Sequence, residues 1–138
     1  MNINELSETD LQAFLALLGY VGNFSESISD SEKTLLSKYC DIKNVDLDSF
    51  LKMIDEAKAS FKLEDALSYF KDKSNEVKRL VYYDLYEFVI ADYIIFDDEM
   101  EVVEKLRDSL GLSVIEYKTL EEEAMSAKQK MAVESAGM

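Results

Sequence analysis

Proline is absent from this chain of 138 residues, and glycine occurs only four times. All-β folds need turns about every 8–12 positions, and glycine and proline are prominent in such turns. Alternating β/α units also need short turns after their strands, for which the sequence offers few candidates. The apolar content of 48% indicates a folded body rather than a disordered chain. Together these features predict an all-helical (all-α) fold.

Histidine is also missing, and Cys40 is the only cysteine. One cysteine without histidine cannot form an internal disulfide or assemble a structural zinc site. No side chain has the ordinary pKa that suits general base catalysis at neutral pH. Cys40 occupies an apolar helical position without an activating partner. These absences predict that the protein is not an enzyme.

Basic residues are scarce: 15 stand against 29 acidic ones, which gives a formal net charge of −14. Binding to a phosphate backbone depends on clustered Lys and Arg, so we predict no direct contact with nucleic acid. The same argument disfavours an anionic membrane surface. The charge suits a partner protein with a basic surface or a divalent cation. Excess carboxylate that serves solubility alone is the competing interpretation.

Long apolar runs are lacking too. The longest near-apolar stretch, residues 88–96, is interrupted by Asp92 and is about half of the roughly 20 residues that a membrane span needs. Residues 1–6 lack the basic region and apolar core of a signal peptide. The sequence therefore predicts a cytoplasmic protein without membrane insertion.

Apolar residues recur at spacings of three and four, and residues suited to helix capping separate the apolar segments. Ser7 is the expected cap of the first helix, and Ser29 with Glu32 forms a capping box for the second. Asp46 or Asp48 caps the third. Continued along the chain, the pattern predicts seven helices.

The later helices have equally clear signals. A fourth, short helix is expected over about 61–70, and a fifth over about 75–93 that is apolar on almost every side and should be the buried centre. The sixth begins at the acidic residues 97–99 and ends at Gly111. The seventh is capped by Ser113 and ends near residue 125, so that residues 126–138 are predicted to be a disordered tail.

The two halves of the chain share their apolar spacing when Glu32 is aligned with Glu99. Leu18 then falls on Leu85, and Leu36 falls on Val103. We predict a single domain of residues 1–125 built from two pseudo-repeated helical hairpin units, the first at about 7–58 and the second at about 75–125. Chance similarity between two amphipathic hairpins is the alternative.

One segment resembles a known family. Residues 91–99 read Ala-Asp-Tyr-Ile-Ile-Phe-Asp-Asp-Glu, and residues 110–113 read Leu-Gly-Leu-Ser. This pattern resembles the TerB-like tellurite-resistance family over about residues 80–120, and more weakly over 19–42. Tyr93 departs from it, since the family has glycine there, and Phe96 stands in place of a small capping residue. The resemblance implies a seven-helix TerB-like bundle and a non-catalytic module of the bacterial stress response.

The same segment supplies a candidate cation site. Asp92, Asp97, Asp98 and Glu99 offer the hard oxygen ligands that Ca²⁺ prefers, and the resemblance implies that such loops bind divalent cations. The spacing is not that of an EF-hand, and the competing interpretation is that the three carboxylates of residues 97–99 only stabilise a helix N-terminus. Ca²⁺ or another divalent cation, weakly bound, is the only cofactor that the residues suggest.

Four tyrosines, Tyr82, Tyr83, Tyr86 and Tyr93, cluster on or next to the expected fifth helix. Because they point in different directions, some should reach the surface, where tyrosine favours protein contacts. Tyr83, Tyr86 and Tyr93 are therefore candidate interaction residues, with core packing as the alternative. The competing function is an adaptor or inhibitor that binds a basic protein surface, including a mimic of nucleic acid.

Overall fold

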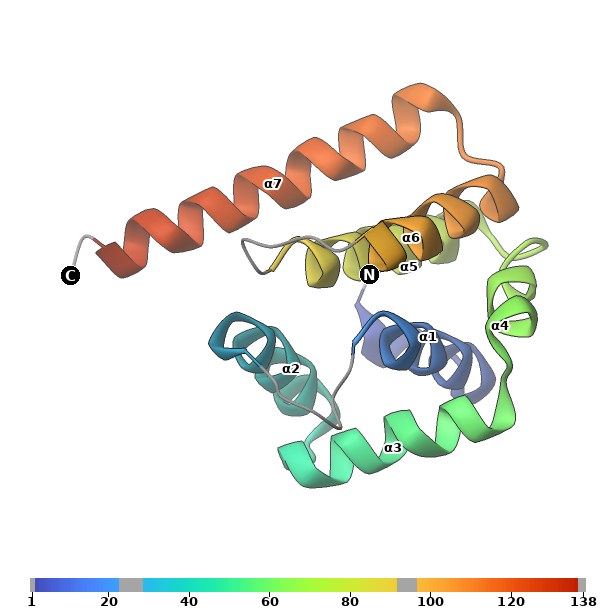
Figure 1. Cartoon of the computed structure of the whole chain (residues 1–138), viewed down its shortest axis with the longest axis horizontal. Helices are drawn as coiled ribbons and strands as arrows, with labels where there is room; N and C mark the ends of the chain where they lie inside the picture. Colours follow the sequence, from blue (N-terminus) through green and yellow to red (C-terminus); the bar gives the residue numbers. More distant parts are fainter. Residues whose placement is uncertain (1, 23–28, 92–96, 137–138) are drawn as a thin grey trace.

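The computed structural model describes residues 2–22, 29–91 and 97–136, and their side chains as far as residue 130. Within these ranges every regular element is a helix, which confirms the all-α class and the seven α-helices (Figure 1). A short 3₁₀ helix, η1, precedes them. The elements are η1 (Ile3–Glu5), α1 (Glu8–Val21), α2 (Asp30–Lys43), α3 (Leu47–Ser60), α4 (Leu63–Tyr69), α5 (Asn75–Val89), α6 (Asp97–Leu110) and α7 (Val114–Ala136).

The capping residues lie where the sequence places them. The backbone N–H of Glu32 donates to Ser29 Oγ and the Ser29 N–H donates to Glu32 Oε1, both at 3.1 Å, which completes the capping box of α2. Of the two candidates for α3, Asp46 is the cap, because its Oδ1 accepts from the N–H of Ser49 at 2.7 Å. Gly111 follows α6 with a φ of 69°, a backbone conformation that favours glycine.

The predicted end of the seventh helix is wrong. α7 does not stop near residue 125 but continues to Ala136, so the segment from Ser126 prolongs the helix instead of forming a tail. Residues 121–136 contain no glycine or proline and are rich in Glu, Ala, Lys, Gln and Met, all strong helix formers. Their lack of apolar periodicity does not prevent helix formation, and Ala124 is the buried residue of this part among the side chains that the structure describes. Even so, α7 is too polar to cross a membrane, and it is the longest of the described helices.

The sequence predicts that the fifth helix, α5, is the buried centre, but the most buried helix of the structure is α1. Six consecutive residues of α1, from Ala13 to Leu18, are essentially inaccessible. α1 packs against α3, α4, α5 and α6 (Figure 1), which together cover it from Ala13 onward. α5 is fully buried only from Val81 onward, apart from two half-buried tyrosines, because its first turns face solvent. α1 is therefore the axis of the bundle.

The largest helix–helix contacts join α1 to α3 and α5 to α7. α6 packs on α5 and also reaches α1 and α4. α2 is attached differently, because its main contacts are with α3 and η1. The division into two repeated hairpins, and the domain limits that accompany it, stay predictions.

Gly19 allows the close approach of α1 and α3. A methyl group at Gly19 would lie 2.8 Å from Ile54 Cγ2 and would overlap the aliphatic part of the Lys58 side chain. The ammonium group of Lys58 lies 5.2 Å from the centre of the Tyr20 ring, whose hydroxyl donates to the Phe61 carbonyl at 2.8 Å. The α1–α3 contact thus combines a small residue with ordered polar contacts at its end.

A polar cluster fixes the other side of α1. The Tyr69 hydroxyl donates to Asp10 Oδ1 at 2.6 Å, and Lys73 Nζ lies 3.1 Å from the same oxygen. Burial alone raises the pKa of Asp10, but the hydrogen bonds from Tyr69 and Lys73 outweigh it and lower the pKa. The ionised carboxylate is thus held in place, which ties α1 to the end of α4 and to the segment between α4 and α5.

We expect Gly19→Ala to lower the free energy of unfolding by about 1–3 kcal/mol, because the added methyl overpacks the α1–α3 contact. The double variant Gly19→Ala/Lys58→Ala should recover part of that loss, since it removes the overlapping side chain. Urea denaturation of the two single variants and the double variant measures this coupling. Strictly additive effects would contradict the close approach.

Candidate functional site

α5 carries two carboxylates on its buried part. Asp84 and Glu87 are both only 8% exposed, and together with Asp10 they are the buried charged residues among those the structure describes. They are three positions apart, so they lie on the same side of the helix. Their neighbours Val81, Leu85 and Phe88 pack into the core. The two acids therefore occupy the edge of the otherwise apolar part of α5 that begins at Val81.

Asp84 faces a hollow of about 610 Å³ formed by η1, α2, α5 and α7. The hollow exists because α2 is held mainly by α3 and η1, while α7 is held by α5. Figure 1 shows α2 and α7 on opposite sides of this region. Its lining residues are Asn2, Ile3, Glu5, Lys38, Tyr39, Ile42, Glu76, Arg79, Leu80, Tyr83, Asp84, Leu120 and Glu123.

The Asp84 carboxylate makes no hydrogen bond or ion pair with any other residue that the structure describes. Burial raises its pKa to about 7, and the nearby negative charge of Glu87 contributes, while Lys38 acts in the opposite direction. Lys38 compensates Glu87 only weakly, because Lys38 Nζ and Glu87 Oε1 are 3.9 Å apart and the lysine side chain is 59% exposed. One basic residue thus serves two buried carboxylates.

Two further buried polar atoms beside Asp84 lack hydrogen bonds within the described ranges: the Tyr39 hydroxyl and Glu87 Oε1. The Tyr39 ring packs against Phe14 and Phe50, which fixes the direction of its hydroxyl. Burial raises the pKa of Tyr39, and the negative charges of Asp84 and Glu87 raise it further. Unsatisfied buried polar atoms are rare in proteins, and here both belong to residues whose charges or dipoles act on Asp84, although only Tyr39 lines the hollow.

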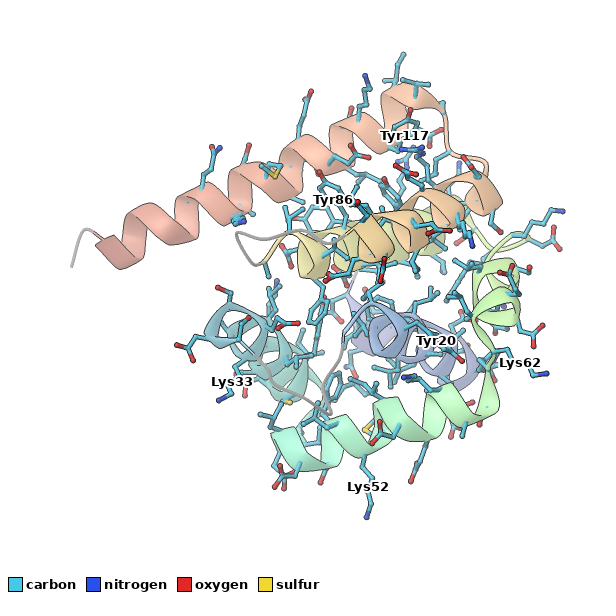
Figure 2. The ribbon with its side chains drawn as sticks, in the orientation of Figure 1. Tyr20, Lys33, Lys52, Lys62, Tyr86 and Tyr117 are labelled. Carbon is cyan, nitrogen blue, oxygen red and sulfur yellow. The ribbon has the colours of Figure 1, made fainter. Side chains whose placement is uncertain are left out.

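The predicted interaction tyrosines separate into different roles. Tyr83 is half-buried and lines the hollow, and burial followed by the charge of Glu87 raises its pKa to about 12. Tyr86 lies on the side of α5 toward α7 (Figure 2), where its ring stacks on that of Tyr82 at 6.2 Å. Tyr82 is fully buried, and its hydroxyl donates to Glu121 Oε2 at 2.6 Å. Tyr93 lies outside the described residues.

The predicted cation ligands can be compared only in part. Asp97, Asp98 and Glu99 lie in the first turn of α6, as expected, and the side chains of Asp97 and Asp98 are exposed. Asp92 lies outside the described residues. Within those residues, no three Asp, Glu, Cys or His side chains are grouped closely enough to hold a metal ion. Cation binding by this segment stays a prediction.

The site residues predicted from the sequence did not include Lys38, Tyr39, Asp84 and Glu87, which with Tyr83 form the most distinctive polar group of the fold. The available signal was the pair of acids, three positions apart, within the most apolar part of the expected fifth helix. Nothing in the spacing indicated that α2 would bring Lys38 and Tyr39 to the same place. That contact depends on the tertiary fold.

In comparisons with known proteins, no family model matches the chain, and no curated protein or solved structure matches it. The resemblance to the TerB-like family accordingly stays a prediction from the sequence.

We expect Asp84→Asn to raise stability at pH 8 by about 2–4 kcal/mol. The native pKa of Asp84, about 7, is above its unfolded value near 3.8. Native-state ionisation is therefore unfavourable, and stability should fall as pH rises from about 4 to 7. The groups that face Asp84 are Lys38 and Tyr39 from α2, and Tyr83 and Glu87 from α5.

Chemical denaturation between pH 4.5 and pH 8 measures this effect. Asp55→Asn is the matched control, since it removes the same charge from an exposed position on α3. The gain from Asp84→Asn should grow with pH beyond that of the control. A gain that is equal at all pH values would show that ionised Asp84 does not strain the native state.

Proposed function

We propose that this chain is a non-catalytic acidic binding module that recognises a basic segment of a partner protein at the hollow between α2, α5 and α7. The observation that carries the proposal is the buried Asp84 carboxylate, which faces the hollow without a hydrogen bond or ion pair within the described part of the chain. A carboxylate in such a place destabilises the fold unless a cation reaches it. A binding role explains why an acid stands there.

The surroundings of Asp84 support a protein ligand in particular. The exposed residues Glu76 and Glu123 add negative charge to the lining of the hollow. Tyr83 adds a half-buried aromatic surface of the kind that is enriched in protein interfaces. The net charge of −14 favours encounter with basic partners over a long range and makes association sensitive to salt.

The finer parts of the proposal rest on the sequence. We assign the chain to a TerB-like architecture of two helical hairpins, acting in a bacterial stress response, on the resemblance of residues 91–99 and 110–113. The pairing of α1 with α3 and of α5 with α7 is compatible with such a duplication. The two halves differ in the middle helix of each unit, since α2 packs on α3 and η1 whereas α6 packs on α5.

Selection from a displayed peptide library tests the proposal. The wild-type chain should enrich peptides that contain Lys or Arg beside apolar residues, and binding should weaken as salt is added. Tyr83→Ala should lower the affinity for the selected peptides by about tenfold, which is the loss expected for an aromatic residue at the centre of an interface. Circular dichroism of each variant verifies that it is folded.

Tyr117→Ala is the matched control for this experiment. Tyr117 is also a half-buried tyrosine, but it lies on α7 (Figure 2) outside the hollow. The Arg107 guanidinium lies 4.5 Å from the centre of its ring. Loss of the Tyr117 side chain should leave peptide affinity unchanged. Enrichment without preference for basic residues, or equal losses from the two variants, would contradict the proposed function.

A further inference from the structure

We propose that the hollow receives the ammonium end of a lysine side chain from the partner, with the Asp84 carboxylate as its counter-ion. This inference rests on the proposed function and names the ligand chemistry of the same site. It requires that the hollow match a lysine in charge, in hydrogen bonding and in the apolar character of its walls.

The charge of the hollow favours a cation. Of the two basic residues in its lining, Arg79 is already paired with Glu116, with Arg79 Nη2 3.1 Å from Glu116 Oε2. The other, Lys38, has its closest charged partner in Glu87 rather than in Asp84. A bound ammonium group would therefore meet a carboxylate that has no partner of its own in the described structure.

The hydrogen-bonding groups favour an ammonium group. An ammonium nitrogen has three N–H donors and no acceptor. Asp84 contributes acceptor oxygens, and Tyr39, whose buried hydroxyl has no hydrogen-bond partner among the described residues, also lines the hollow. A carboxylate or phosphate ligand would place a second negative charge beside Asp84 and Glu87, which the single exposed Lys38 could not offset.

The walls of the hollow suit the stem of a lysine. Ile3, Ile42, Leu80 and Leu120 supply aliphatic surface, and the ring of Tyr83 supplies aromatic surface. Lysine buries its four methylene groups along such surfaces while its charge meets a polar end. The combination of an apolar wall with one deep carboxylate separates this hollow from the solvated acidic surface elsewhere.

Lys38 acts as a built-in competitor in this arrangement. Its long, mostly exposed side chain reaches the carboxylate pair from the rim without a close contact. Removal of its charge should therefore strengthen the binding of an external cation, whereas removal of the Asp84 charge should weaken it. If the cluster had a merely structural role, the two changes would not alter cation affinity in opposite directions.

The first test is an NMR titration of the full chain with n-butylammonium, which reproduces the end of a lysine side chain, and with n-butanol as the uncharged control. We expect n-butylammonium to shift the amides of Lys38, Tyr39, Tyr83 and Asp84 before others, with millimolar affinity, and n-butanol to bind at least ~5-fold more weakly. Asp84→Asn should lower the affinity for n-butylammonium by ~10-fold or more, and Lys38→Met should raise that affinity by ~3-fold. Asp55→Asn, which removes the same charge elsewhere, should change neither affinity nor shifts.

The second test uses a basic peptide from the displayed library, in which each lysine is replaced in turn by acetyl-lysine. One acetylated position should lose ~10-fold or more in affinity, and that loss should disappear in the Asp84→Asn variant. The intact peptide should bind at least ~10-fold more tightly than n-butylammonium, since a partner adds contacts around the hollow.

Each failure has its own meaning. Uniform small shifts with n-butylammonium, or equal effects of Asp84→Asn and Asp55→Asn, would overturn the lysine site. Basic peptides that still bind, with no single critical lysine, would overturn it while leaving the proposed function standing. Failure to select any basic peptide would overturn the proposed function itself.

Discussion

The burial of α1 from Ala13 to Gly19 is the constraint on which the remaining structure depends. The unbroken apolar run from Ala13 to Leu18 leaves this part of the helix without a solvent face, so it must be covered by other helices. α3, α4, α5 and α6 provide that cover. Gly19 sets the distance to α3, and the Asp10 cluster with Tyr69 and Lys73 sets the position of the segment between α4 and α5. Helices without extensive contacts to α1 are positioned by their contacts with the helices that cover it.

α2 and α7 are those helices, and the hollow between them follows from that position. α2 is anchored by α3 and η1, and α7 by α5. Neither fills the space in front of Asp84, so a carboxylate on the central part of α5 stays buried without a partner in the described structure. Packing alone would favour an apolar residue there, because an unpaired buried acid is unfavourable. This conflict between stability and sequence is typical of functional positions.

Local signals were sufficient for much of the fold. Ser29 with Glu32, Asp46 and Gly111 mark helix ends through contacts within a few residues, and such contacts can be read from the chain. The identity of the central helix could not be predicted from such local contacts, since it depends on how many neighbouring helices cover α1. The extension of α7 was missed because helix propensity without apolar periodicity resembles a polar tail. The site was missed because Lys38 and Tyr39 meet Asp84 only through the tertiary fold.

The most direct measurement of the central claim is the titration of the Asp84 carboxyl carbon by ¹³C NMR, in the free protein and with a lysine peptide bound. In the free protein the pKa should be near 7, because burial disfavours the ionised carboxylate. A bound ammonium group should lower that pKa, and the peptide should bind more tightly above pH 7 than below it. A pKa near the ordinary value for aspartate, unchanged by the peptide, would contradict both the uncompensated carboxylate and its role as the counter-ion of a lysine.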